Sequence, residues 1–417
     1  MSENKKKVLI VGSSAKEYAL AKKFVSYDNI SEVFAAPGNP AMKDFCTCID
    51  IREDKPDELL EFVLENAIDL TVASSEKAIK ADIAAFFHAN NQLIFAPTLQ
   101  SANFAISKSF GKKFLYKLHI PTPRFGIFEK EQVAHDYLKT SNMPVVIRMD
   151  ENLEGRDRLV CPTLPIAKTF VTDLFMKGEP KVLIEDYVYG HEFTFYVLTD
   201  GYSALPLTSV ANYKFMEEGD GGLLTSGVGA YAPDYKISSE IENAVMKNVI
   251  SNVLSSLQRR ETPYLGILGV DCVLKEDGKF VSLEFRTFLS DHDCQAVLNL
   301  IDENLYTLFE ACAIGSFADD YETIRIADYS SVSCVLYSKI EGSSIKGLDL
   351  VEDSSDISHF NTKKNPYMEF ETPKGKALVV TKTAKTLTRA RKILYEDIEL
   401  IEFSGKKFRN DICPAVL

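Results

Sequence analysis

Short apolar runs alternate with amphipathic segments over the first hundred residues of the chain. Four runs have the length and composition of strands buried on both faces. They lie at residues 7–12, 32–39, 67–74 and 93–97, with helical periodicity at 15–25, 56–67 and 80–90. Strands that alternate with helices predict a doubly wound α/β domain with a parallel sheet, which binds ligands at the carboxyl ends of its strands.

The pattern changes after this region. A Lys-rich helix is predicted over 96–118 and another helix over 239–257. Alternating apolar and polar positions bounded by turn residues predict antiparallel hairpins. These segments are 143–150, 180–201 and 264–286, and a last β-rich module begins near residue 328. The pattern therefore predicts a multidomain α/β and α+β protein.

Length, charge and cysteine content narrow the class of protein. A chain of 417 residues is too long for one compact core. Its net charge of −13 argues against general nucleic-acid binding, although a local cluster of Lys and Arg can still bind an anionic substrate. Among eight cysteines only Cys46 and Cys48 are close in sequence, and no zinc-ligand spacing occurs, which favours reduced thiols.

The beginning of the chain and its hydropathy bear on localisation. The first residues pass from a polar lead directly into a strand, unlike a signal peptide. No run of about 18 apolar residues is present that could span a bilayer. We therefore predict a soluble, cytoplasmic protein.

One predicted hairpin brings two carboxylates together. A two-residue turn at Asp277–Gly278 would place Asp271 opposite Glu284, with their Cβ atoms roughly 5 Å apart. Arg286 follows Glu284 by two positions and shares its face of the strand. Two facing carboxylates can hold Mg²⁺, or Arg286 can neutralise them in a structural ion cluster. The pattern leaves both alternatives open.

Several motifs follow one another in an order that resembles a known family. They are GSSAKEYAL (12–20), APGN (36–39), SSE (74–76), SKSFGK (107–112), VLIEDYVYGHEFT (182–194), the block 206–231, ISHFNT (357–362) and KKFRNDI (406–412). Their order and spacing resemble glycinamide ribonucleotide synthetase, an ATP-grasp family of purine biosynthesis. The resemblance spans nearly the whole chain.

The resemblance implies a fold and a reaction. It predicts an N-terminal substrate-binding domain at 1–102, an ATP-grasp domain at 103–327 with a lid subdomain near 122–190, and a C-terminal β-rich domain at 328–417. The implied reaction joins glycine to 5-phosphoribosylamine through glycyl phosphate, with ATP and Mg²⁺ or Mn²⁺ as cofactors. Small molecules are the expected partners, without nucleic acid or membrane. A monomer is compatible with the resemblance, and so is a protein partner.

The resemblance also assigns roles to residues. ATP binding is predicted for Lys108, Lys112, Arg148, Glu185, Asp186, Tyr187, Val188 and Glu192. Catalysis is predicted for Arg148, Lys214 and Asp291. Substrate binding is predicted for Gly12, Ser13, Glu17, Gly38, Asn39, Glu76, Asp220, Thr225 and Gly227. Metal binding is predicted for Glu284 and Asp271, and a solvated Lys pair is the alternative for Lys108 and Lys112.

The sequence departs from the family at the predicted chemistry. Arg286 stands where the family has a metal-binding Asn, and Phe288 stands where it has an Arg. The blocks Ala211–Phe215 and Leu223–Leu224 are also changed, and the phosphate-covering loop carries Glu151, Glu154 and Asp157. Three hypotheses follow: a divergent synthetase, an ATP-grasp ligase with another acid and amine, or a non-catalytic relative that binds a nucleotide or a protein.

Overall fold

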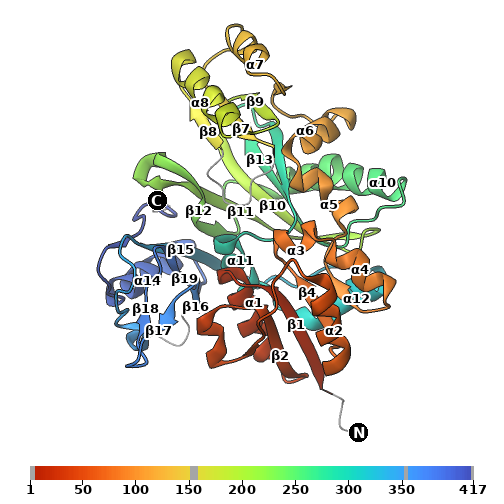
Figure 1. Ribbon diagram of the computed structural model, residues 1–417, viewed down its shortest axis with the longest axis vertical. Helices are drawn as coiled ribbons and strands as arrows, with labels where there is room; N and C mark the ends of the chain where they lie inside the picture. Colours follow the sequence, from red (N-terminus) through yellow and green to blue (C-terminus); the bar gives the residue numbers. More distant parts are fainter. Residues whose placement is uncertain (1–4, 151–157, 352–355, 415–417) are drawn as a thin grey trace.

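The computed structural model describes residues 5–150, 158–351 and 356–414. A parallel sheet forms the N-terminal end, a small antiparallel sheet forms the opposite end, and a long nine-stranded sheet lies between them (Figure 1). The last strands of the chain extend the long sheet on its other side. None of the helices in these ranges has the length and apolar character needed to cross a membrane.

The N-terminal sheet is parallel throughout, as predicted, with strand order β3-β2-β1-β4-β5. Its strands are β1 (Lys6–Gly12), β2 (Ile30–Pro37), β3 (Thr47–Cys48), β4 (Leu70–Ala73) and β5 (Ile94–Phe95). Its helices are α1 (Ala15–Val25), α2 (Pro56–Asn66), α3 (Glu76–Lys80) and α4 (Ile83–Ala89), and a 3₁₀ turn, η1, spans Pro40–Asp44. The sequence pattern missed β3 because two residues are too few to show periodicity.

Alternation along β1 explains why helices cover both faces. Val8 and Ile10 pack in one cluster with α1, while Leu9 and Val11 pack in another with α2 and α4. All four side chains are completely buried. A strand with apolar residues on both faces cannot leave either face in water, so the sheet is wound on both sides.

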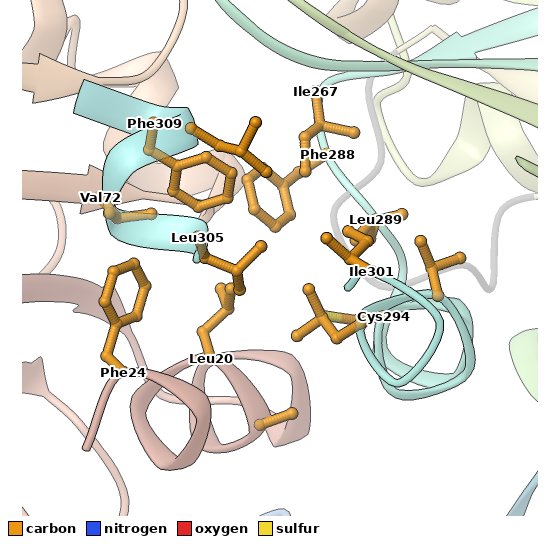
Figure 2. Close-up of a cluster of buried hydrophobic side chains, with 14 of the residues drawn as sticks. Leu20, Phe24, Val72, Ile267, Phe288, Leu289, Cys294, Ile301, Leu305 and Phe309 are labelled. Carbon is orange, nitrogen blue, oxygen red and sulfur yellow. The ribbon is translucent and has the colours of Figure 1, made fainter. Parts of the chain in front are cut away.

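The first of these clusters joins the N-terminal sheet to distant residues (Figure 2). Leu20 and Phe24 of α1 pack with residues of α11 (Asp291–Leu298) and α12 (Leu305–Ile314). Phe95 stacks on Phe309 with ring centroids 3.9 Å apart. Phe288, which replaces the family arginine, lies in the same cluster and is buried. The side chain that stands in place of the family arginine is therefore part of the hydrophobic core.

The Lys-rich segment forms two helices rather than the single predicted one. These are α5 (Leu99–Ile106) and α6 (Lys108–Lys117). Ser107 between them is extended, and its hydroxyl accepts the N–H of Phe110 as an N-cap. Asp150 accepts a second N–H of the first turn, from Ser109, at 2.6 Å. These caps make a new helix start more favourable than continuation.

The small sheet and its helices form the end drawn in yellow and orange in Figure 1. Its strands pair antiparallel in the order β6-β9-β7-β8. They are β6 (Phe125–Phe128), β7 (Val145–Met149), β8 (Arg158–Cys161) and β9 (Val182–Asp186). Helices α7 (Glu131–Leu138) and α8 (Leu164–Met176) cover one face of it and share one hydrophobic cluster with the sheet.

The long sheet has the order β14-β13-β10-β11-β12-β15-β19-β16. Its strands are β10 (His191–Thr199), β11 (Ala204–Glu217), β12 (Gly221–Ala232), β13 (Gly266–Leu274), β14 (Phe280–Arg286), β15 (Ser330–Ser338), β16 (Asp356–His359) and β19 (Gly375–Ala384), with β20 (Lys406–Lys407) paired to β15. The predicted hairpin at 180–201 is wrong, because β9 and β10 belong to different sheets and residues 187–190 connect them.

The remaining elements complete the two sides of the long sheet. They are η2 (Glu218–Asp220), α9 (Ser239–Val245), a π-helical turn η3 (Met246–Ile250), α10 (Ser251–Gln258), α13 (Phe317–Asp320), η4 (Leu348–Leu350), β17 (Lys363–Lys364), β18 (Phe370–Glu371) and α14 (Leu387–Leu400). The helix predicted at 239–257 is thus confirmed. Because β15, β19 and β16 continue the central sheet, the domain boundaries stay a prediction.

The hairpin of β13 and β14 has the predicted pairing for a different reason. Lys275, not Glu276, closes the turn with Lys279, so the loop has three residues and Gly278 adopts φ +76°. This shifts the pairing by one residue. A bulge between Ser282 and Glu284 shifts it back and leaves Asp271 opposite Glu284.

Candidate active site

A cleft of about 260 Å³ lies between the small sheet, the long sheet and the N-terminal domain. Six cationic side chains line it, against three carboxylates. The cations are Lys16, Lys108, Arg148, Arg158, Lys214 and Arg286, and the carboxylates are Glu76, Glu284 and Asp291. The cleft is therefore positive although the whole chain is acidic.

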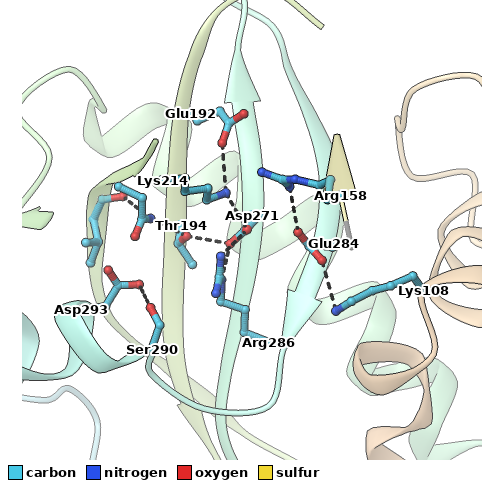
Figure 3. Close-up of polar contacts among 12 residues, drawn as sticks. Lys108, Arg158, Glu192, Thr194, Lys214, Asp271, Glu284, Arg286, Ser290 and Asp293 are labelled. Carbon is cyan, nitrogen blue, oxygen red and sulfur yellow. Dashed lines mark hydrogen bonds and ion pairs between the residues drawn. The ribbon is translucent and has the colours of Figure 1, made fainter. Parts of the chain in front are cut away.

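Glu284 of β14 is contacted by three cations from the facing elements, and Figure 3 shows two of them, Lys108 and Arg158. Its Oε2 lies 3.1 Å from Lys108 Nζ and 3.0 Å from Arg148 Nη1, and its Oε1 lies 3.4 Å from Arg158 Nη1. Burial alone would raise the pKa of Glu284, but the charges of Arg148, Lys108 and Arg158 outweigh burial and hold that pKa well below its usual range. Glu284 is thus a carboxylate saturated with positive partners.

Asp271 of β13 is held as tightly. Arg286 donates from Nε and Nη2 to its two oxygens, both at 2.7 Å. Lys214 Nζ lies 3.0 Å from Oδ2, and the Thr194 hydroxyl donates to Oδ1 at 2.7 Å. Burial works against the charged form, yet Arg286 and Lys214 lower the pKa of Asp271 below its ordinary value. Lys214 also contacts Glu192 at 2.9 Å.

Glu185 links the cleft to the small sheet. Arg148 Nη2 and Lys112 Nζ approach its carboxylate at 2.6 and 2.5 Å. Lys112 is almost fully buried, and its amine also donates to the Thr122 hydroxyl. The predicted pairing of Lys108 and Lys112 on one helix face is confirmed, but they serve two different carboxylates.

A narrow slot opens from the cleft beside the connection between the two sheets. Asp186, Tyr187 and Val188 form one edge, and the walls include Val146 and Val160. Val273 and Leu283 of the long sheet also line it. Arg148 and Arg158 line both the slot and the cleft, so the two spaces are adjacent. The arrangement suits a ligand with a flat apolar end and a polyanionic end.

The turn between β1 and α1 forms the opposite wall. Asp291 accepts the N–H of Lys16 at 3.1 Å. Burial opposes ionisation, but Lys16 and Lys376 lower the pKa of Asp291. Glu17 is buried and is bound by Ser14 and Ser74, so its carboxylate holds the turn from below. Glu76 begins α3 at this wall.

Two other predicted substrate residues hold loops together. Asn39 follows Gly38, which has φ +66°, and is buried. Its amide donates to the carbonyl groups of Ser13 and His359 at 3.2 and 3.1 Å. Asn39 therefore connects the first turn of the chain to the C-terminal region. Substrate contact by Gly12, Ser13, Glu17, Gly38 and Asn39 stays a prediction.

Predicted residues in the glycine-rich hairpin separate into two places. Thr225 lines the cleft, and its hydroxyl bonds the carbonyl of Lys214 at 2.8 Å. A Cβ on Gly227, which has φ +120°, would lie 1.7 Å from Cε1 of His292. Asp220 lies elsewhere: it is two-thirds exposed and pairs with Arg409 at 3.0 Å. Its predicted substrate contact has no support from this position.

Buried polar groups beneath the cleft fix its floor. Asp293 is fully buried and accepts from Tyr196 and Ser290, both at 2.6 Å. With its amide oriented to satisfy both polar atoms, Asn212 also donates to Asp293 at 2.6 Å. His292 beside them is buried, and burial lowers its pKa to about 4. The changed block Ala211–Phe215 thus has an internal partner in α11.

Sequence reasoning missed several cleft residues. Arg158 and Lys16 received no role, and neither did Ser226, which accepts from Lys376 Nζ at 2.7 Å. A signal for Arg158 existed, because it opens a strand directly after the phosphate-loop motif. No sequence motif pointed to Lys376, because only the fold brings β19 next to the glycine-rich hairpin that carries Ser226. Glu151, Glu154 and Asp157 lie outside the described residues.

The predicted metal ligands do not form a ready metal site. Among the residues that the structure describes, no group of three or more His, Cys, Asp or Glu side chains could hold a metal ion. Glu284 and Asp271 each accept from two or more cations, as given above. A divalent ion would have to displace these cations to reach the carboxylate oxygens. The assignment of both as metal ligands stays a prediction.

This combination of two sheets around a cationic cleft and slot is that of the ATP-grasp class. A model of the phosphoribosylglycinamide synthetase ATP-grasp (A) domain matches residues 106–294, and one of the N domain of the same enzyme matches residues 6–104. Together the two matches cover well over half of the chain. The chain belongs to the phosphoribosylglycinamide synthetase family.

Similar proteins extend this likeness to the full length. Phosphoribosylamine–glycine ligase of Neisseria meningitidis serogroup B is 29% identical, with 99% of each chain covered. The ligase of Halalkalibacterium halodurans is 28% identical, with 97% of this chain and 96% of the other covered. The crystal structure of the Thermotoga maritima ligase has a TM-score of 0.83 at 22% identity, and covers 98% of this chain and all of that one.

A second structural neighbour comes from a different ATP-grasp enzyme. It is the biotin carboxylase domain of 2-oxoglutarate carboxylase from Hydrogenobacter thermophilus, in complex with MgADP, ADP and bicarbonate. Its TM-score is 0.74 at 15% identity, and the match covers 97% of this chain and 91% of the other. This likeness shows the shared fold. The predicted fold class is thereby confirmed.

Proposed function

We propose that the chain is an ATP-dependent carboxylate–amine ligase that joins glycine to 5-phosphoribosylamine in purine biosynthesis. The other products are ADP and phosphate, and glycyl phosphate is the intermediate. The observation that carries this proposal is that the slot and the cationic cleft lie next to each other, since Arg148 and Arg158 line both. The family membership and the full-length relatives support it. Cytoplasmic location stays a prediction.

The residues of the chain supply binding and charge in this reaction. We assign the adenine ring to the slot beside Tyr187 and Val188, which its apolar lining supports. Nucleotide, when bound, supplies the phosphoryl group that activates the carboxylate. Lys108, Arg148 and Arg158 converge where charge must be stabilised during such a transfer. Lys214 and Asp291 also line the cleft and are candidates to bind the carboxylic acid and the amine.

The test is ADP formation that depends on both substrates. With freshly prepared phosphoribosylamine, glycine and MgATP, we expect ADP release, and we expect none above background when either substrate is left out. Absence of ADP release with all three present would overturn the proposal for this pair of substrates.

A second candidate function has one observation in its favour. Arg286 stands where the family has a metal-binding Asn and binds both oxygens of Asp271, and Phe288 stands where the family has an Arg and is buried in the core. This favours a ligase with another acid and amine, or a relative that binds nucleotide without turnover. ADP formation with a panel of other acids and amines would support the former. ATP binding without hydrolysis under every substrate condition would support the latter.

A further inference from the structure

The carboxylates expected to hold a divalent ion are already paired with the protein's own cations. Asp271 has Arg286 on both oxygens and Lys214 on one, and Glu284 has three cations within 3.4 Å. Mg²⁺ needs carboxylate oxygens at about 2.0–2.1 Å in near-octahedral geometry. Placing a dication there would break these contacts and set it beside several positive groups. The residues as arranged do not fit an ion held by the protein.

The paired network carries more positive than negative charge. Ion pairs of 2.5 to 3.4 Å join six cations to four carboxylates. The cations are Lys108, Lys112, Arg148, Arg158, Lys214 and Arg286, and the carboxylates are Glu185, Glu192, Asp271 and Glu284. The network therefore has two more positive than negative charges, and the lining of the cleft itself has six cations against three carboxylates. Such a site attracts an anion of high charge.

Several of these cations keep donors available toward the cleft. A guanidinium has five N–H donors, and the bonds to Asp271 use only Nε and Nη2 of Arg286. The side chains of Arg286 and Lys108 are 23% and 21% exposed, and both line the cleft. A guanidinium group can bind two phosphate oxygens at once, as it binds the two oxygens of a carboxylate. The same groups that neutralise the carboxylates can thus contact phosphate.

We propose that the cleft binds the polyphosphate of its nucleotide through these side-chain cations, so that nucleotide binding does not require a divalent metal ion. Arg286 has the central role because it occupies Asp271 and presents further donors to the cleft. A divalent ion used later in the reaction would then be carried by the phosphates of the nucleotide. This inference rests on the proposed function, since it concerns the nucleotide of the same ligase.

The test is calorimetric titration of the full chain with ATP, once in EDTA and once in excess Mg²⁺. We expect the dissociation constant in EDTA to lie within about threefold of that with Mg²⁺. Arg286→Gln should weaken binding in EDTA by about tenfold or more, since it removes charge-assisted hydrogen bonds. Arg158→Gln gives a second variant, because Glu284 keeps two other cations when Arg158 is removed. Arg325→Gln is the matched control: that arginine pairs on the surface with Glu303.

The outcomes separate the inference from the proposed function. Binding in EDTA that both cleft variants weaken and the control does not supports the inference. Binding only with Mg²⁺ overturns the inference and leaves an ATP-dependent ligase intact. Absence of ATP binding in either buffer overturns the inference and the proposed function together. Equal binding in EDTA by wild type, Arg286→Gln and Arg158→Gln would also overturn the inference, because these cations would not be the binding groups.

Discussion

Arg286 binds both carboxylate oxygens of Asp271 at 2.7 Å, across the β13–β14 hairpin. Asp271 is completely enclosed by protein, whereas Arg286 reaches the cleft surface. The pair therefore joins a buried charge to the proposed nucleotide site. Of the two alternatives that the sequence left open for this hairpin, the geometry favours the ion cluster.

Removing the buried member of this pair should destabilise the fold. Asp271→Asn would leave Arg286 and Lys214 partly buried without their main counter-charge, and the loss of one partner of a buried pair typically costs about 3–5 kcal/mol. Urea unfolding measures this change. Asp277→Asn, at the exposed turn of the same hairpin, should leave the free energy of unfolding nearly unchanged. Equal stability of the two variants would contradict the enclosure of Asp271.

Gly227 should tolerate no side chain. Gly227→Ala combines a φ of +120° with a Cβ 1.7 Å from the ring of His292, so we expect a loss of about 3 kcal/mol or more. Gly178→Ala has a φ of +87° with open space around the new Cβ, and should cost about 1 kcal/mol. The difference between their free energies of unfolding isolates the contact with His292. A Gly227→Ala variant as stable as Gly178→Ala would show that the contact is absent.

His292 should make stability fall as the pH drops below neutral. Its pKa is lowered by burial to about 4 in the folded chain, against an ordinary value of 6.5. Between these values the unfolded chain binds a proton that the folded chain does not, so this group removes ~1.4 kcal/mol of stability per pH unit as pH falls from 6.5 to 4. Asp291, Asp293, Lys376 and Arg286 surround it and leave this direction unchanged.

The measurement is the free energy of unfolding across pH 7 to 4.5. His292→Asn should reduce the slope of the free energy of unfolding between pH 6.5 and 4.5 by ~1.4 kcal/mol per pH unit, which corresponds to one proton. An unaltered slope in His292→Asn would show that this histidine titrates alike in both states.

Filling the slot should separate recognition of the base from recognition of the phosphates. Val160→Phe places a ring where the slot is lined by Val146 and Val273, so ATP affinity should fall roughly tenfold. Inorganic triphosphate, which needs only the cations, should bind within about twofold of wild type. Val133→Phe on the exposed face of α7 is the control. A parallel loss of triphosphate binding would place the phosphates in the slot instead.

Local patterns predicted much of the fold. The alternation of apolar strands with amphipathic helices predicted the parallel sheet. Strands such as β1 are buried on both faces and therefore leave a continuous apolar run in the sequence. The break between α5 and α6 was not predicted, although Ser107 is a local N-cap, because the second capping residue, Asp150, lies about forty residues further along the chain. The hairpin predicted at 180–201 is wrong because a turn motif does not show which sheet each strand joins.

The candidate site was predicted in part. Asp271 and Glu284 were correctly placed opposite one another, because two errors in the predicted register cancelled. The turn has one residue more than predicted, and a bulge that was not predicted shifts the pairing back. Arg148, Lys108, Lys214 and Asp291 do line the cleft. Residues whose position depends on a contact across the whole fold were beyond reach of local pattern, as Lys376 beside Ser226 and Asp220 beside Arg409 illustrate.

The proposed reaction of this chain forms an amide bond between glycine and phosphoribosylamine. The most direct measurement is mass spectrometry of the reaction products with ¹³C-labelled glycine, freshly prepared phosphoribosylamine and MgATP. We predict a labelled glycinamide ribonucleotide that accumulates in equal amount with ADP. Complete recovery of labelled glycine, with ATP bound but not hydrolysed, would show that the chain does not form this amide bond.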